Sequence, residues 1–99
     1  MAAAKPSVRF ERHALQDLRQ GVFWYEAKQE GLGARFAAEV KRAINVIATS
    51  PERWPLRQGT RRYVLRGFPY TVAYRATETA VVIFAVAHHR LDPGSWDQR

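Results

Sequence analysis

Apolar and polar residues alternate in the second half of the chain. Large apolar side chains recur at every second position, at Tyr63 and Leu65 within residues 61–66 and at Tyr70, Val72 and Tyr74 within residues 70–75. This pattern is typical of strands with one covered face. Residues 80–87 are apolar at every position, as in a strand covered on both faces. Breaks at Gly67-Phe68-Pro69 and at residues 76–79 separate these segments. The pattern predicts three antiparallel strands, the third in the middle of a sheet.

The first half of the chain has two stretches with helical spacing. Residues 13–30 repeat an apolar side chain at Leu15, Leu18, Val22 and Tyr25, and residues 34–49 do so at Phe36, Val40, Ile44 and Ile47. Gly31 suits the left-handed position after a first helix, and Ser50-Pro51 ends the second. Two helices with so short a connection predict an antiparallel hairpin.

Exposed apolar residues are also expected on the first helix. Phe23 and Trp24 widen its apolar surface beyond one stripe, which indicates packing against a neighbouring helix or a partner protein. In the loop of residues 51–60, Trp54 is predicted to pack over an edge of the core.

A short strand is predicted at the start of the chain. Ser7 to Glu11 alternates, with Val8 and Phe10 expected to face the core, but its pairing partner is not indicated. The fold class is therefore α+β in the order β-α-α-β-β-β, with an N-terminal helical hairpin packed on one face of an antiparallel sheet. Residues 1–99 form a single domain. The side chains expected on the uncovered, concave face are Arg62, Arg66, Thr71 and Arg75.

Length and composition narrow the class of protein. A chain of 99 residues can bury a core without disulfide bonds or a structural metal, and this chain has no cysteine. Its start lacks the long apolar core of a signal peptide, and its longest apolar run is too short to span a bilayer. We expect a soluble, cytoplasmic protein.

The charge is strongly positive and unevenly distributed. The formal net charge is +7, and residues 53–77 contain six arginines and no acidic residue. Such a surface attracts nucleic acid or an acidic protein. A solvated arginine-rich face that aids solubility is the plainer interpretation.

A metal-independent nuclease site is one chemistry that these residues could support. RNA cleavage needs a base, an acid and cations that stabilise the phosphorane. His88 and His89 are the residues beside the basic strands that titrate near neutral pH, and Arg62, Arg66 and Arg75 could clamp a phosphate. No acidic residue is near them in sequence to serve as a base, and a strand histidine is more often structural than catalytic.

No cofactor or metal is expected. His88 and His89 point to opposite faces if their strand continues, so they cannot share one ion. The chain has no cysteine cluster, no His-x-x-x-His spacing and no glycine-rich phosphate loop.

The chain as a whole resembles the RelE/ParE superfamily of toxins from bacterial type II toxin–antitoxin systems. The residues that carry the resemblance are spread over nearly the full length: Ala14, Asp17-Leu18, Tyr25, Gly33-Ala34-Arg35-Phe36, Val40, Ser50-Pro51, Arg61-Arg62, Phe68-Pro69-Tyr70, Tyr74-Arg75, Val86-Ala87-His88, Arg90, Pro93, Trp96 and Arg99. The tail departs from the usual pattern at Leu91, where related sequences often have arginine, and at Ser95, where they often have tyrosine.

The resemblance implies a toxin held inactive by a cognate antitoxin, ParD-like or similar, in a hetero-oligomer. ParE-like members poison DNA gyrase, whereas RelE-like members cut messenger RNA on the ribosome. RelE-like nucleases tend to have arginine where this chain has Thr71, so the ParE-like branch is favoured. A RelE-like ribosome-dependent endoribonuclease is the alternative, and a non-toxic basic adaptor that binds nucleic acid is the third hypothesis. The residues expected to bind antitoxin or target are Arg61, Arg62, Arg66, Arg75, Arg90 and Trp96.

Overall fold

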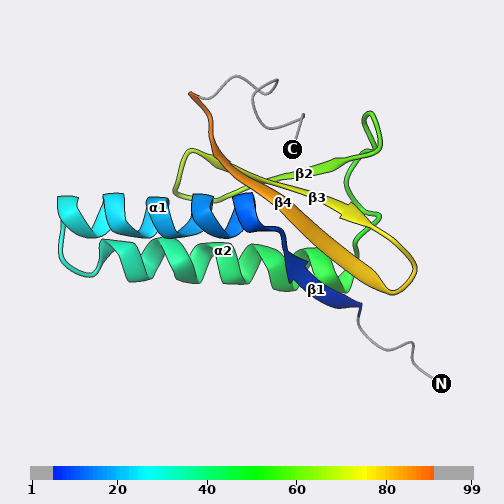
Figure 1. Ribbon diagram of the computed structural model, residues 1–99, viewed down its shortest axis with the longest axis horizontal. Helices are drawn as coiled ribbons and strands as arrows, with labels where there is room; N and C mark the ends of the chain where they lie inside the picture. Colours follow the sequence, from blue (N-terminus) through cyan, green and yellow to red (C-terminus); the bar gives the residue numbers. More distant parts are fainter. Residues whose placement is uncertain (1–5, 91–99) are drawn as a thin grey trace.

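The computed structural model describes residues 6–90 of the chain (Figure 1). The elements in chain order are β1 (Ser7–Phe10), α1 (Arg12–Lys28), α2 (Leu32–Thr49), β2 (Arg61–Val64), β3 (Tyr70–Ala76) and β4 (Ala80–His88). They form the predicted β-α-α-β-β-β order. In Figure 1 the two helices run alongside each other in opposite directions and lie against the sheet. Neither helix in residues 6–90 is both long and apolar enough to cross a membrane.

The turn between the helices is fixed by a glycine and a carboxylate. Gly31 has a φ of 86°, the left-handed conformation that its position predicted. The Glu26 carboxylate accepts hydrogen bonds from the backbone N–H groups of Gly31 at 2.9 Å and of Gly33 at 3.0 Å. These donors would otherwise lack partners at the start of α2. The helical hairpin is therefore held closed at its tip.

A second glycine allows α1 and α2 to approach closely. A Cβ atom on Gly21 would lie 2.5 Å from Cε2 of Phe36, well inside van der Waals contact. Ala14 and Gly21 are buried on α1, whereas Leu15 stays 37% exposed. Three of the four residues of the expected face, Leu18, Val22 and Tyr25, pack against the core as predicted. Leu15 alone of these four is more exposed than expected, because the small residues take the most buried positions beside the Phe36 ring.

The sheet has the strand order β1-β4-β3-β2, so β4 is central as predicted. β2, β3 and β4 pair in antiparallel fashion. β1 instead runs parallel to β4, from Ser7 opposite Ala80 to Phe10 opposite Ile83. The expected antiparallel sheet is therefore mixed at this edge. No tight turn joins β1 to its partner, so local sequence could not fix its direction.

The core lies between the helices and one face of the sheet. Its largest fully buried side chains include Phe36, Ile47, Val72 and Tyr74. Phe10 packs against this core as expected, but Val8 is 38% exposed because it lies on an edge strand. Trp54 packs over the core edge beside Tyr63, with ring centroids 5.0 Å apart.

A bulge in β4 changes which side chains face the helices. Ala73 pairs with Ala85 but Tyr74 pairs with Ile83, which leaves Phe84 without an opposite residue. Phe84 and Ala85 consequently join Ala73 in a second buried cluster, separate from the core beneath the helices. The bulge explains how the uninterrupted apolar strand β4 contributes buried side chains to both faces of the sheet.

Candidate functional site: the arginine-lined face and edge of the sheet

The sheet face turned away from the helices is the first candidate surface. Tyr70, Val72 and Tyr74 face the helical core, so the alternate residues of β3, Thr71 and Arg75 among them, face the other way. In the paired strand β2, Arg62 lies opposite Ala73 and shares this far face. Ala73 and Phe84 are fully buried there, and Arg62, Thr71 and Arg75 are half-buried. The face that was expected to be uncovered is therefore not an open surface.

The arginines on this far face and at its ends have different surroundings. The Arg75 guanidinium carbon lies 4.2 Å from the centroid of the Phe84 ring, a cation–π contact. Arg62 is half-buried, whereas Arg66, just beyond the end of β2, and Arg90, two residues after β4, are exposed. The face thus combines a fully buried apolar floor with a rim of cations.

Arg61 is placed differently from the other arginines. It lies opposite Tyr74, on the helix side of β2. Its Nη1 donates to the backbone carbonyls of Trp54 and Glu52, while the Tyr74 hydroxyl donates to the carbonyl of Pro51 at 2.6 Å. The structure therefore gives Arg61 a role in holding the loop between α2 and β2. Trp96, which was also expected to bind antitoxin or target, lies outside the described residues.

The two neighbouring histidines face opposite sides of the sheet. The His88 ring packs edge-on against Tyr70 at 5.0 Å, on the helix side. His89 Nε2 lies 3.1 Å from the Thr71 hydroxyl oxygen, on the far side. They cannot share one metal ion, and residues 6–90 contain no cluster of three or more His, Cys, Asp or Glu side chains suited to one.

His88 is held in its neutral form. Its Nδ1 accepts a hydrogen bond from the backbone N–H of Arg90 at 3.0 Å. Burial lowers the His88 pKa, and the nearby charges of Arg90 and His89 lower it further. A neutral imidazole packed on a tyrosine is suited to a structural role at the end of β4.

Sequence reasoning missed a polar cluster between α1 and the sheet. Asp17 Oδ2 accepts the backbone N–H of Val86 at 3.0 Å. Tyr25 and Tyr70 share a side-chain hydrogen bond, and burial is the main cause that raises the pKa of each phenol. Asp17 could have been singled out from the sequence, because an aspartate on the inward-facing side of an apolar helix needs a hydrogen-bond partner there.

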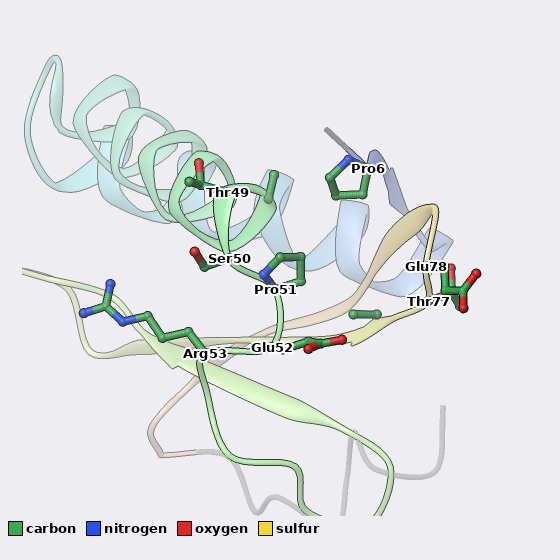
Figure 2. A pocket seen from close by; sticks show the side chains of 10 residues that line it. Pro6, Thr49, Ser50, Pro51, Glu52, Arg53, Thr77 and Glu78 are labelled. Carbon is green, nitrogen blue, oxygen red and sulfur yellow. The ribbon is translucent and has the colours of Figure 1, made fainter. Parts of the chain in front are cut away.

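Two of the cavities beside the sheet differ in whether they contain predicted site residues. Figure 2 shows one of about 530 Å³ between the C-terminal end of α2 and the β3–β4 turn, where Ser50, Pro51 and Thr77 are among its lining residues. It contains none of the predicted site residues. The other, a groove of about 500 Å³, follows the outer edge of β2 and includes Arg62 and Arg66 in its lining.

Comparisons with known proteins agree with this architecture. The sequence matches a family described as "ParE toxin of type II toxin-antitoxin system, parDE" over residues 8–93. A solved structure of the chromosomal ParDE toxin–antitoxin system from P. aeruginosa is similar in fold, with a TM-score of 0.72 and 16% identity over 85% of this chain and 96% of that chain. A chain of the RelBE2 toxin–antitoxin complex from Mycobacterium tuberculosis is 30% identical, with a TM-score of 0.59 over 88% of this chain and 94% of that one. No curated protein sequence matches significantly.

Proposed function

This chain belongs to the ParE toxin family of type II toxin–antitoxin systems, and we propose that it inhibits growth by poisoning DNA gyrase and is neutralised by a cognate antitoxin. Gyrase acts on cytoplasmic DNA, so the proposal implies a cytoplasmic protein. The family match covers residues 8–93 and includes both helices and every strand. The match to the ParE branch of the superfamily is therefore the reason for proposing gyrase as the target.

The placement of titratable side chains is the observation that carries this choice. Residues 61–77 and 80–89, which supply β2 to β4, contain no carboxylate. His88 is turned to the helix side, and His89 is bonded to Thr71. An acid–base pair for RNA cleavage would need two titratable groups that converge on one phosphate. Among the described residues, the far face and its rim have a single histidine beside arginines, which favours a binding surface over a hydrolytic centre.

The alternative is a RelE-like ribosome-dependent endoribonuclease. It is favoured by the 30% identity to a chain of the RelBE2 complex and by His89 and Arg62 on one face of the sheet. In this alternative His89 would be the base or acid, and Arg62, Arg66 and Arg75 would stabilise phosphate charge. His88 would contribute only through packing.

Induction in cells with two parallel readouts distinguishes these functions. The gyrase proposal predicts altered plasmid supercoiling with a DNA-damage response, and inhibition of purified gyrase by the purified toxin. Rapid cleavage of translated messages with unchanged supercoiling would replace it with the nuclease alternative. Full induction without a growth defect would support the third hypothesis, a non-toxic basic adaptor.

The antitoxin is proposed to meet two kinds of surface. Phe23 and Trp24 are 79% and 56% exposed on α1, and apolar side chains of a partner would cover them. Acidic residues of the same partner would meet Arg62 and Arg66. α1 packs on β4, and β3 separates β4 from β2, so such a partner has to wrap around the domain. A segment that folds on binding is suited to this.

Association kinetics test the antitoxin surface. The Arg62→Glu, Arg66→Glu double variant should associate with the product of the neighbouring gene more slowly than wild type at low salt, and the difference should shrink as salt increases. Arg9→Glu, Lys41→Glu is the matched control, because both residues are exposed, on β1 and α2, and belong to neither surface proposed for the antitoxin. Equal association rates for both double variants would remove the sheet arginines from the antitoxin surface. Failure of any neighbouring product to bind would argue against the antitoxin itself.

A further inference from the structure

The groove along β2 joins Arg62 and Arg66, which the proposed antitoxin contact uses, to side chains that it does not use. β2 is an edge strand, so its outer side has no neighbouring strand in the sheet. α2 and the loop after it form the opposite wall. The groove therefore combines side chains from three segments that are separate in sequence.

Both walls of the groove carry arginines. The helix and loop wall supplies Arg42 and Arg53, and the strand wall supplies Arg62 and Arg66. None of the described residues that line the groove is acidic. Glu39 pairs with Arg42 at 2.9 Å across an exposed turn of α2, and such a surface pair is weak. The local charge is strongly positive, which selects an anionic ligand.

Two aromatic residues lie among these arginines. Trp54 and Tyr63 both line the groove, half-buried, with their rings in an edge-to-face arrangement 5.0 Å apart. Arg53 lies over the Trp54 ring, with its guanidinium carbon 5.4 Å from the centroid. A basic groove with apolar ring surface is the combination found in sites for single-stranded nucleic acid.

We propose that this β2-edge groove binds the phosphodiester backbone of single-stranded nucleic acid, without sequence preference. Arginines on two walls can surround one backbone, whereas a duplex displays its phosphates over a broad convex surface. An acidic amphipathic peptide would need several exposed apolar side chains to anchor it. Val64 is the exposed large apolar residue in the groove lining, and the most exposed one of the described residues, Phe23, is on α1. The guanidinium groups form bidentate hydrogen bonds to phosphate oxygens.

The salt dependence of binding measures how many phosphates the groove neutralises. The purified full-length chain should bind a fluorescein-labelled oligothymidylate of about 16 nucleotides. About four neutralised phosphates give a slope of log affinity against log salt near −3, or about fiftyfold weaker binding between roughly 50 and 200 mM salt. The Arg42→Gln, Arg53→Gln variant should lower the magnitude of that slope by about 1.4.

A charge-matched control separates the groove from general attraction. The Arg12→Gln, Arg19→Gln variant has the same net charge as the groove variant, but its changes are on α1. It should keep the wild-type slope of log affinity against log salt. The single change Arg66→Gln removes an exposed side chain and should lower the slope by about 0.7 without loss of fold. Equal weakening by the groove and control variants would overturn the proposal, as would tighter binding of a duplex of the same length or full displacement of the oligonucleotide by polyglutamate. These measurements involve neither gyrase nor growth, so they can fail while the gyrase proposal stands.

Discussion

Asp17 should stabilise the domain through one hydrogen bond between α1 and β4. β1 pairs with β4 only as far as Ile83. Beyond that point the N–H of Val86, a residue only 2% exposed, donates to Asp17 Oδ2 at 3.0 Å. The carboxylate thus satisfies a backbone group that the short edge strand does not reach. Replacing Asp17 with alanine removes the acceptor and leaves a buried donor without this partner.

The expected cost follows from the charge and the burial. A hydrogen bond to a charged group contributes about 1.5–3 kcal/mol, and an unsatisfied buried donor costs a similar amount. We expect Asp17→Ala to lower the free energy of unfolding by about 2–3 kcal/mol, which lowers Tm by about 10–20 °C in a domain of this size. Asp17→Asn keeps an acceptor oxygen without the charge, so it should cost about half as much.

Denaturant unfolding and amide hydrogen exchange test this reasoning together. In Asp17→Ala, the protection of the Val86 amide against hydrogen exchange should fall by more than the loss of global free energy of unfolding accounts for. Glu30→Ala removes the same charge from an exposed position after α1 and should leave Tm almost unchanged. If Asp17→Ala melts within about 2 °C of the Glu30→Ala variant, the hydrogen bond does not contribute as argued.

Three further outcomes are expected. Gly21→Ala should destabilise the fold by about 1–3 kcal/mol in thermal unfolding, because its Cβ would meet the Phe36 ring at 2.5 Å; a gain in stability would show that helix propensity outweighs the steric clash. The folded-state pKa of His88 is below its ordinary value of 6.5, so the unfolded chain binds the proton more readily. The free energy of unfolding should therefore fall as pH drops through 6.5 and toward the lowered pKa. Denaturant midpoints measured against pH should show this fall, and His88→Asn should make them depend less on pH. Alanine at His88 or at His89 should leave growth inhibition intact in variants that fold, whereas parallel loss of toxicity and of RNA cleavage would favour the nuclease alternative.

Local patterns in the sequence determined most of the elements. Alternation in β2 and β3 and the continuous apolar run of β4 placed three strands in the right order, because side-chain direction in a strand follows a period of two. Gly31 marked the helix connection, since few other residues adopt its positive φ. The opposite orientations of His88 and His89 also follow from strand geometry. Each of these features depends on residues within a few positions of one another.

Tertiary packing decided the features that join distant segments. The parallel pairing of β1 with β4 brings Ser7 beside Ala80, and no local rule selects that partner or direction. Phe36 packs against Gly21, so the small residues of α1 take its most buried positions and Leu15 stays exposed.

The candidate surfaces depend on the same long-range packing. Composition showed an excess of arginines, but the fold assigns Arg61 to the α2–β2 loop and brings Arg42 opposite Arg62 across the β2-edge groove. The sequence therefore determined which elements form and that their surface is basic. Only contacts between residues far apart in the chain decided which arginines hold the fold and which line a site, because those positions follow from packing that no local pattern specifies.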